Sequence, residues 1–199
     1  MRRHLCILIS LVFFPSWFPS LLLAAEKTPP EIRELADSEI VGFGTDPVIV
    51  AAVKAQNAAK ISLAEIRKMD QKWITTPGIA PFVKALMESE CGMHLRDIQK
   101  KTPFYAEIFV MDSQGALVAA TDKTSDYWQG DEAKFTESFN DSKGGIHISD
   151  IEFDESAQVY IVQVSVPVTD SGTVVGALTV GIDLDMMEQM QGRPGSLSE

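Results

Sequence analysis

The sequence is poor in cysteine and histidine, and it has no long apolar run beyond its first 25 residues. Two cysteines and three histidines occur among 199 residues. Cys6 lies in the N-terminal apolar segment, so Cys91 is the one cysteine expected in the folded domain and no disulfide can form within it. Cys91 could pair with another chain or stay a buried thiol, which is commoner on an apolar helix face. A thiolate metal site within one chain is excluded.

Sequence patterns of catalytic and metal sites are also missing. His94 and His147 begin no His-x-x-x-His motif, and no Gly-x-Ser-x-Gly elbow occurs. The acidic residues between positions 122 and 132 do not follow the spacing of an EF-hand loop, which leaves calcium binding as a minor alternative. The sequence therefore predicts a protein that is not an enzyme and needs neither a metal nor a cofactor.

Positive charge is scarce as well. The chain has 17 Lys and Arg against 28 Asp and Glu, a net charge of −11. Nucleic acid and anionic lipid both repel such a chain. We therefore do not expect nucleic-acid binding.

The N-terminal segment has the layout of a bacterial secretory signal peptide. Arg2 and Arg3 precede an apolar run over residues 5–14, and the segment ends in small residues at Ala25. Pro15 and Pro19 interrupt the apolar run, which disfavours the alternative of an uncleaved membrane anchor. We expect residues 1–25 to be a Sec signal peptide and the protein to be periplasmic or secreted.

The first half of the remaining chain is predicted to be helical. Residues 31–38 suit a short helix, and Asp46 followed by Pro47 is a strong helix start. Small and apolar residues then recur at spacings of three and four up to Trp73, which predicts one long helix over 46–73. Its small-residue stripe suits packing within the chain or a homodimer seam equally well. Two shorter helices are expected, at 81–91 and 93–101.

Beyond residue 105 the hydrophobic period changes to two. Strands are expected at 106–111, 116–121, 146–153, 158–169 and 173–183, with short helices at 131–139 and 186–191. Helices followed by an antiparallel meander of about five strands, with the helices on one face, make an α+β fold. We expect a single domain over 26–185 and a short tail over 186–199.

The last two strands have unlike faces. If residues 170–172 form a three-residue loop, Val168 pairs with Val174, and valines, Leu178 and Ile182 share an apolar face. The opposite face is small and polar: Gln163, Ser165, Ala177, Thr179, Gly181 and Asp183. Solvent exposure would be ordinary for this face. Because it lacks the Lys, Glu and Arg of exposed strands, we favour a small ligand lying between this face and a lid.

The expected lid is the loop over 124–135. Tyr127 and Trp128 are adjacent there, among Asp126 and Asp131. Aromatic faces and carboxylates together bind ammonium or polar groups. Trp128 could instead anchor the loop, and Asp131 could cap a helix. The predicted ligand site consists of Asp126, Tyr127, Trp128, Asp131, Gln163, Ser165, Thr179 and Asp183.

Four segments together resemble a single-Cache extracytoplasmic sensor domain, which is PAS-like and of the PDC type. They are AEIFVMDSQG at 106–115, TSDYWQGDEAK at 124–134, VSVPV at 164–168 and VGALTVGID at 175–183. The helix beginning DPVIVAAVKAQN at 46–57 is similar to the long N-terminal helix of such proteins. The resemblance implies a pocket between sheet and lid loop for an amino acid, amine or small carboxylate. It places Tyr127, Trp128 and Asp131 in the lid and matches Asp183 to the acid that often holds a ligand amino group.

The chain departs from membrane-bound members of that family in two respects. Those members continue into a transmembrane helix and a kinase, cyclase or chemoreceptor module, so we expect a stand-alone form that works with a separate membrane receptor or kinase. Amino-acid pockets also usually offer an Arg, and the arginines at positions 33, 67, 96 and 193 are not on the predicted pocket face. An amine or uncharged polar ligand is therefore favoured. The alternative function is a protein-interaction module that docks on a receptor through the Tyr127–Trp128 loop.

Overall fold

The computed structural model describes residues 28–154 and 158–192. The predicted signal peptide and the end of the predicted tail lie outside these residues. Among the described residues, none of the helices has both the length and the apolarity of a membrane span.

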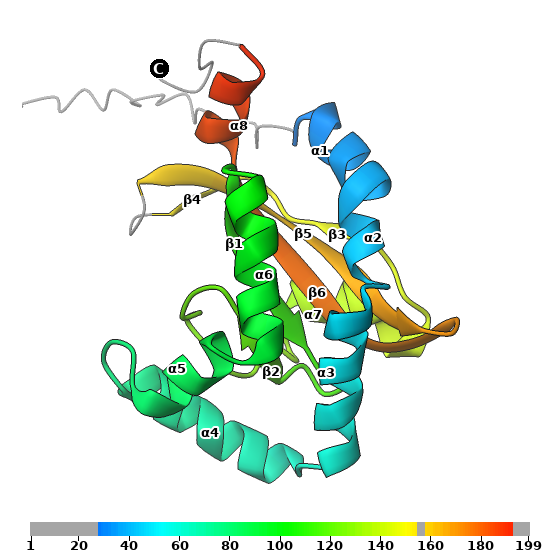
Figure 1. Ribbon diagram of the computed structural model, residues 1–199, viewed down its shortest axis with the longest axis vertical. Coiled ribbons are helices and arrows are strands. Elements are labelled where there is room, and N and C mark those ends of the chain that lie inside the picture. Colours follow the sequence, from blue (N-terminus) through cyan, green and yellow to red (C-terminus); the bar gives the residue numbers. More distant parts are fainter. Residues whose placement is uncertain (1–27, 155–157, 193–199) are drawn as a thin grey trace, which may run out of the picture.

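Helices precede and flank an antiparallel sheet (Figure 1). The helical elements are α1 (Pro30–Leu35), η1 (Ala36–Ile40), α2 (Val41–Phe43), α3 (Pro47–Ala59), α4 (Leu63–Thr75), α5 (Pro81–Met87), α6 (Glu90–Lys101), α7 (Ala133–Phe139), η2 (Asn140–Ser142) and α8 (Leu184–Met190). The strands are β1 (Tyr105–Met111), β2 (Leu117–Ala120), β3 (His147–Ile148), β4 (Glu152–Asp154), β5 (Val159–Asp170) and β6 (Thr173–Asp183). The predicted α+β class is confirmed.

The prediction of one helix over 46–73 is wrong, because the chain turns between α3 and α4. Lys60 adopts a left-handed conformation with φ 51° and ψ 42°, which ends α3. Ser62 then begins α4 with a capping box: its hydroxyl accepts a hydrogen bond from Glu65 N, and the Glu65 carboxylate accepts from Ser62 N. The N-cap prediction for Asp46 is confirmed, since its carboxylate accepts from the N–H groups of Val48 and Ile49.

A second helix boundary also differs from the prediction. The helix that begins at Pro81 ends at Met87 instead of at Cys91. Ser89 begins α6, and its hydroxyl accepts from Gly92 N at 3.0 Å. Cys91 and Gly92 therefore lie in the first turn of α6, where a capping serine outweighs the break that a glycine suggests.

The sheet has the strand order β2-β1-β6-β5-β3, with β4 also paired to β5. The strand predicted over 146–153 is two short strands, since β3 pairs with residues around Ser165 and β4 with residues around Tyr160. The last hairpin is as predicted in its strands but not in its register. Val168 pairs with Gly176, not Val174, because Ser171 and Gly172 make a two-residue turn and the register shifts at Val168/Thr169. A shift of two residues leaves the two faces unchanged.

Both faces of the sheet are covered, which corrects the expectation of helices on one face alone. The apolar face packs against α1, η1, α3 and α6 in the larger core, which includes Ile49, Leu95 and Val164. On the other face, Phe109 and Met111 of β1 pack with Trp73 of α4 and Phe135 of α7 in a second core. Figure 1 shows α6 and α3 in front of the sheet and α7 behind it. The polar face of the last hairpin therefore lies under α7.

Candidate functional site

The middle of the polar face of the last hairpin is buried, while Gln163 and Asp183 are half-buried. Ser165 and Thr179 lie opposite one another on β5 and β6, and both are fully buried. Their hydroxyl groups are hydrogen-bonded to each other at 2.8 Å. Each hydroxyl thereby gives the other a partner, so this part of the face is a closed, internally satisfied contact.

Two further polar side chains on this face meet across Gly181. Glu107 of β1 and Gln163 of β5 both have Gly181 of β6 as their strand partner. A Cβ at Gly181 would lie 2.6 Å from the Glu107 side chain, so the glycine leaves room for the contact. Gln163 Nε2 donates to Glu107 Oε1 at 2.8 Å. Burial raises the pKa of the Glu107 carboxyl group, against the lowering effects of the Gln163 hydrogen bond and the charge of Lys134.

A small hollow reaches these two side chains from the β4 side of the sheet. It has a volume of about 190 Å³ and is lined by Glu107, Ser149, Glu152, Phe153, Asp154, Ile161 and Gln163. Drug-sized ligands occupy roughly 300–1,000 Å³, so this hollow suits a molecule of only a few non-hydrogen atoms.

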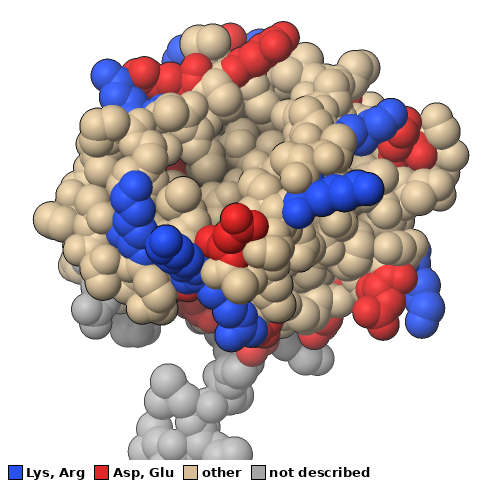
Figure 2. Space-filling view, turned by 90° about the horizontal axis from the view of Figure 1, so that it is seen from below, with Lys and Arg blue, Asp and Glu red and all other residues tan. Residues whose placement is uncertain are grey.

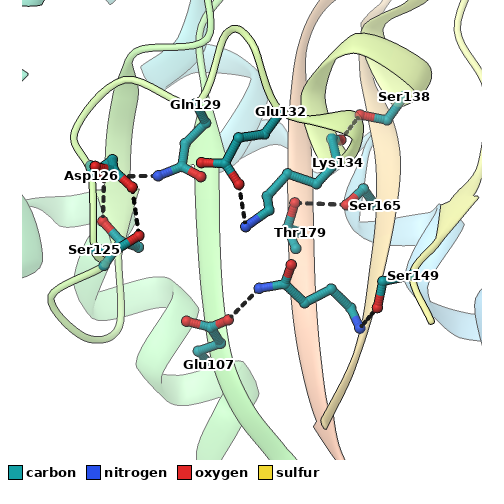
Figure 3. A network of polar contacts seen from close by, with 12 residues as sticks. Glu107, Ser125, Asp126, Gln129, Glu132, Lys134, Ser138, Ser149, Ser165 and Thr179 are labelled. Carbon is teal, nitrogen blue, oxygen red and sulfur yellow. Dashed lines mark hydrogen bonds and ion pairs between the residues drawn. The ribbon is translucent and has the colours of Figure 1, made fainter. Parts of the chain in front are cut away.

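The loop before α7 adds charged and polar groups above the same face (Figure 3). Lys134 of α7 is 18 % exposed, and its ammonium group is 2.9 Å from Glu132 Oε2. The same ammonium lies 5.7 Å from the centre of the Phe109 ring. Lys134 thus stands above β1 between Glu132 and Glu107.

Gln129 is the most deeply buried residue of this loop, at 1 % exposure. Its Nε2 donates to Asp126 O at 2.8 Å. Among the described residues, Gln129 Oε1 is the one buried side-chain oxygen or nitrogen without a hydrogen-bond partner. Figure 3 shows this oxygen turned toward Glu132 and Lys134.

Tyr127 and Trp128 do not lie over the polar face. Tyr127 packs against Trp73 of α4, with ring centres 5.8 Å apart. The Trp128 ring lies under the Arg67 guanidinium, 4.5 Å from its centre, and its Nε1 donates to Gln114 O. The two rings hold the loop to α4 and to the β1–β2 turn. For Trp128 this is the anchoring role that the sequence left open.

The backbone of the loop is fixed as firmly as its rings. Asp70 of α4 accepts hydrogen bonds from the N–H groups of Tyr127 and Trp128, at 2.9 and 3.1 Å. Leu117 N donates to Tyr127 O, and Gln129 N donates to Gly115 O. These hydrogen bonds hold the loop in place along β2, with the Gln129 side chain in the interior.

The remaining predicted residues are not brought to the cluster of Glu107, Gln129, Glu132, Lys134 and Gln163. Asp126 and Asp131 line a second, open hollow of about 570 Å³ with Arg67, Asp70, Gln71, Trp128 and Glu132, and Glu132 is the residue that this hollow shares with the cluster. Asp183 N-caps α8, where its carboxylate accepts from Met186 N at 2.9 Å. Of the eight residues predicted, Gln163 joins this cluster directly, while Ser165 and Thr179 lie on the same face.

The sequence did not predict four residues of this cluster: Glu107, Gln129, Glu132 and Lys134. Glu107 is a lone acid in an otherwise apolar strand, which was a signal of a special role. No arginine lies on the predicted pocket face, and the cation beside Glu132 is the Lys134 ammonium group instead. Gln129 follows two large aromatic residues, and its own residue type gives no sequence signal of burial.

The surface seen from the α4 side is mixed in charge despite the net charge of −11. Figure 2 shows a row of Lys and Arg side chains there, with acidic side chains beside them. This face does not carry a large field of one sign.

The family model of the methyl-accepting chemotaxis protein-like first PDC sensor domain matches residues 85–189, more than half of the chain. The chain belongs to this family. The match of the PDC domain begins in α5 and ends in α8, so it includes the whole sheet and the loop that carries Gln129. The resemblance to a PDC-type sensor domain is confirmed, and the family is one of sensor domains rather than enzymes. No curated protein matched the sequence.

Solved structures similar to this PDC domain are sensor domains. The DctB histidine kinase sensor domain of V. cholerae is 17 % identical with a TM-score of 0.43, and the match covers 80 % of this chain and 57 % of that one. The sensory domain of the Campylobacter jejuni chemoreceptor Tlp3 is 12 % identical with a TM-score of 0.42, covering 84 % and 70 %. The ligand-binding domain of the Pseudomonas aeruginosa amino acid chemoreceptor PctC, in complex with GABA, is 10 % identical with a TM-score of 0.37, covering 79 % of this chain and 65 % of that one. The chain thus spans little more than half of the DctB domain.

Proposed function

We propose that this PDC domain is an extracytoplasmic sensor that binds a small amine, amino acid or carboxylate-type metabolite and acts in signal transduction with a separate membrane receptor or kinase. The observation that carries the proposal is the cluster of Glu107, Gln129, Glu132, Lys134 and Gln163 on a buried polar face. Gln129 is buried and the two glutamates, Lys134 and Gln163 are half-buried, and a set of half-buried groups of both charges is unusual in a purely structural core. The family membership and the predicted signal peptide agree with a sensor outside the cytoplasm.

Lys134 widens the ligand class that the cluster accommodates. The sequence offered no arginine to a ligand carboxylate, but the Lys134 ammonium group is a cation on the buried face. A carboxylate would contact Lys134, and an amine would contact Glu107 or Glu132. The hollow beside Glu107 and Gln163 is not lined by Lys134 or Glu132, and with about 190 Å³ it would hold a ligand of few atoms.

The alternative of a docking module has less support. It requires the Tyr127 and Trp128 rings to meet a partner, whereas both are engaged within the domain by Trp73, Arg67 and Gln114. A homodimer through the N-terminal helix stays a prediction; Ala55 and Ala59 of the predicted stripe are exposed on α3.

A thermal-shift screen of metabolites, together with mass spectrometry of small molecules released from freshly purified protein, tests the proposal. A specific ligand at about 100 times its Kd stabilises a protein by roughly 2.7 kcal/mol, which moves the Tm by several degrees. We expect Lys134→Met and Gln163→Leu to abolish this shift. The matched control is Lys84→Met, which removes an exposed lysine of α5 that pairs with Glu88.

Two results would reject the proposal. One is a screen in which no metabolite raises the Tm and no molecule is released from the protein. The other is a shift that is equally large in the wild type and in both folded cluster variants.

A further inference from the structure

A hollow of about 350 Å³ lies between α4, α5, β2 and the last turn of α3. Its volume is at the lower end of the roughly 300–1,000 Å³ that ligand pockets occupy. Most of its wall is apolar, and the lining includes Met69, Trp73, Phe82, Leu86, Leu117 and Tyr127. Trp73 and Leu117 are buried and the other four are half-buried, so the hollow is a recess at the edge of the second core.

Three aromatic rings and a thioether surround this space. The Trp73 ring centre lies 6.1 Å from that of Phe82 and 5.8 Å from that of Tyr127, and both pairs are inclined. Trp73 Nε1 donates to Thr124 O at 2.8 Å, so the polar atom of this ring already has a partner. Aromatic rings and the sulfur of Met69 both make favourable contacts with a further ring. The wall therefore suits an aromatic molecule.

The hollow has one polar end, at Gln56. Gln56 Nε2 donates to Asp112 Oδ2 at 2.9 Å and to Leu117 O at 3.1 Å. The amide orientation is fixed, since turning it over would place Oε1 against these two acceptors. Within residues 28–154 and 158–192, neither Gln56 Oε1 nor the Tyr127 hydroxyl has a hydrogen-bond partner, and neither is sealed from water. Gln56 Oε1 is thus an acceptor that a ligand can reach.

The charges around the hollow favour a neutral ligand. None of the described residues that line it is charged. Asp112, which lies behind Gln56, is 2 % exposed, and its carboxylate already accepts from two backbone N–H groups as well as from Gln56 Nε2. The Lys72 ammonium group is 4.2 Å from the centre of the Phe82 ring but does not line the hollow. A charged ligand would lose its hydration here without gaining an ion pair.

We propose that this hollow binds a small neutral aromatic molecule that carries one N–H or O–H group. The ring of the ligand lies against Trp73 and Phe82, and its N–H or O–H group donates to Gln56 Oε1. This site shares no residue with the polar cluster described above, so the inference goes beyond the sensor proposal and does not depend on it. Tyr127 lines the hollow and Gln129 belongs to the cluster, so one loop contacts both places.

Three probes with the same bicyclic frame separate the contributions to binding. Indole carries an N–H donor, benzofuran has an ether oxygen in its place, and indole-3-carboxylate adds a negative charge at pH 7. NMR titration of the unmodified protein follows the signals of Trp73 Nε1–H, the Gln56 amide and Leu117 N–H. We expect indole to shift these signals and to bind roughly threefold to tenfold more tightly than benzofuran, which is the gain from one neutral hydrogen bond. Indole-3-carboxylate should bind more weakly than indole.

A pair of methionine variants locates the binding site. Met69→Gln makes one wall of the hollow polar, with little change in side-chain length or helix propensity. We expect the affinity for indole to fall by roughly threefold or more, because apolar contact with the ring is lost. The matched control is Met93→Gln, the same replacement at a position of α6 that is 53 % exposed. It should leave the affinity as in the wild type.

The inference is overturned if indole shifts none of the three signals, and the sensor proposal survives that result. Equal affinities for indole and benzofuran, or equal effects of the two methionine variants, also overturn it. A second copy of the chain is the rival occupant of the hollow. Signals that change with protein concentration before any probe is added, and that no longer do so in Met69→Gln, would assign the hollow to a contact between copies and overturn the inference.

Discussion

The hydroxyl pair of Ser165 and Thr179 offers a sharp test of the buried polar face. Thr179→Val keeps the side-chain shape and removes the hydroxyl, so Ser165 Oγ, which is fully buried, loses its partner at 2.8 Å. A buried polar group left unpaired costs about 1–3 kcal/mol of unfolding free energy. Ser165→Ala leaves the Thr179 hydroxyl without a hydrogen-bond partner in the same way. Each single variant should be destabilised by this amount.

The double variant should regain most of the loss. Replacing both partners by apolar groups is nearly neutral, because no polar atom is then left without a partner. The expected coupling energy is therefore favourable and at least 1 kcal/mol, within the range of 0.5–3 kcal/mol found for residues in contact.

Urea unfolding at 25 °C measures the four free energies of this double-mutant cycle. Thr173→Val, at the exposed start of β6, is the control and should change the free energy of unfolding by less than about 0.5 kcal/mol. The reasoning fails if the losses of the two single variants simply add in the double variant. That outcome would mean that the hydroxyls do not depend on each other.

Three other perturbations test the description of the site. Asp70→Ala leaves the N–H groups of Tyr127 and Trp128 unpaired, so we expect a loss of roughly 2 kcal/mol of unfolding free energy and faster hydrogen exchange at those two amides. Unchanged exchange would contradict the conclusion that Asp70 holds this loop in place. Burial raises the pKa of the Cys91 thiol to about 12, so iodoacetamide should label this thiol at pH 8 only as fast as the domain unfolds. Rapid labelling of the native protein would contradict the burial of Cys91. Because the pKa of Glu107 is raised in the folded state, the stability that it contributes is present at low pH and is lost as the pH rises through that pKa. Unfolding of Glu107→Gln at pH 4 and pH 7 should therefore show that the variant gains stability relative to the wild type toward pH 7, and a gain toward pH 4 would refute this sign.

Much of the sheet could be predicted because its signals are local. The last strand was predicted over 173–183 and is observed as Thr173–Asp183, since period-two alternation and a turn at Ser171 and Gly172 both mark it. The error of two residues in the hairpin register did not change which residues share a face, because side chains alternate with a period of two. The broken helix was also locally encoded: the capping box of Ser62 and Glu65 was visible in the sequence but was outweighed by the helical periodicity around it.

The site could be predicted only in part, because its contacts depend on strand order. Glu107 and Gln163 are 56 residues apart in the sequence. They meet because β6 lies between β1 and β5, and Gly181 of β6 is the strand partner of both residues. Nothing in the local sequence of either strand specifies that arrangement. In the same way, the position of Trp128 depends on Asp70, 58 residues earlier. Composition alone could identify the loop as unusual but could not tell which of its side chains point inward.

The pairing of the loop with β2 also determines how this sheet meets other molecules. Ala116 and Trp128 form an isolated antiparallel bridge at the outer side of β2, so part of that margin is already occupied by the chain itself. At the opposite margin, β3 and β4 are only 2 and 3 residues long. Within residues 28–154 and 158–192, neither margin offers a long, free row of backbone donors and acceptors to a neighbouring copy, which disfavours aggregation of this acidic domain by strand pairing.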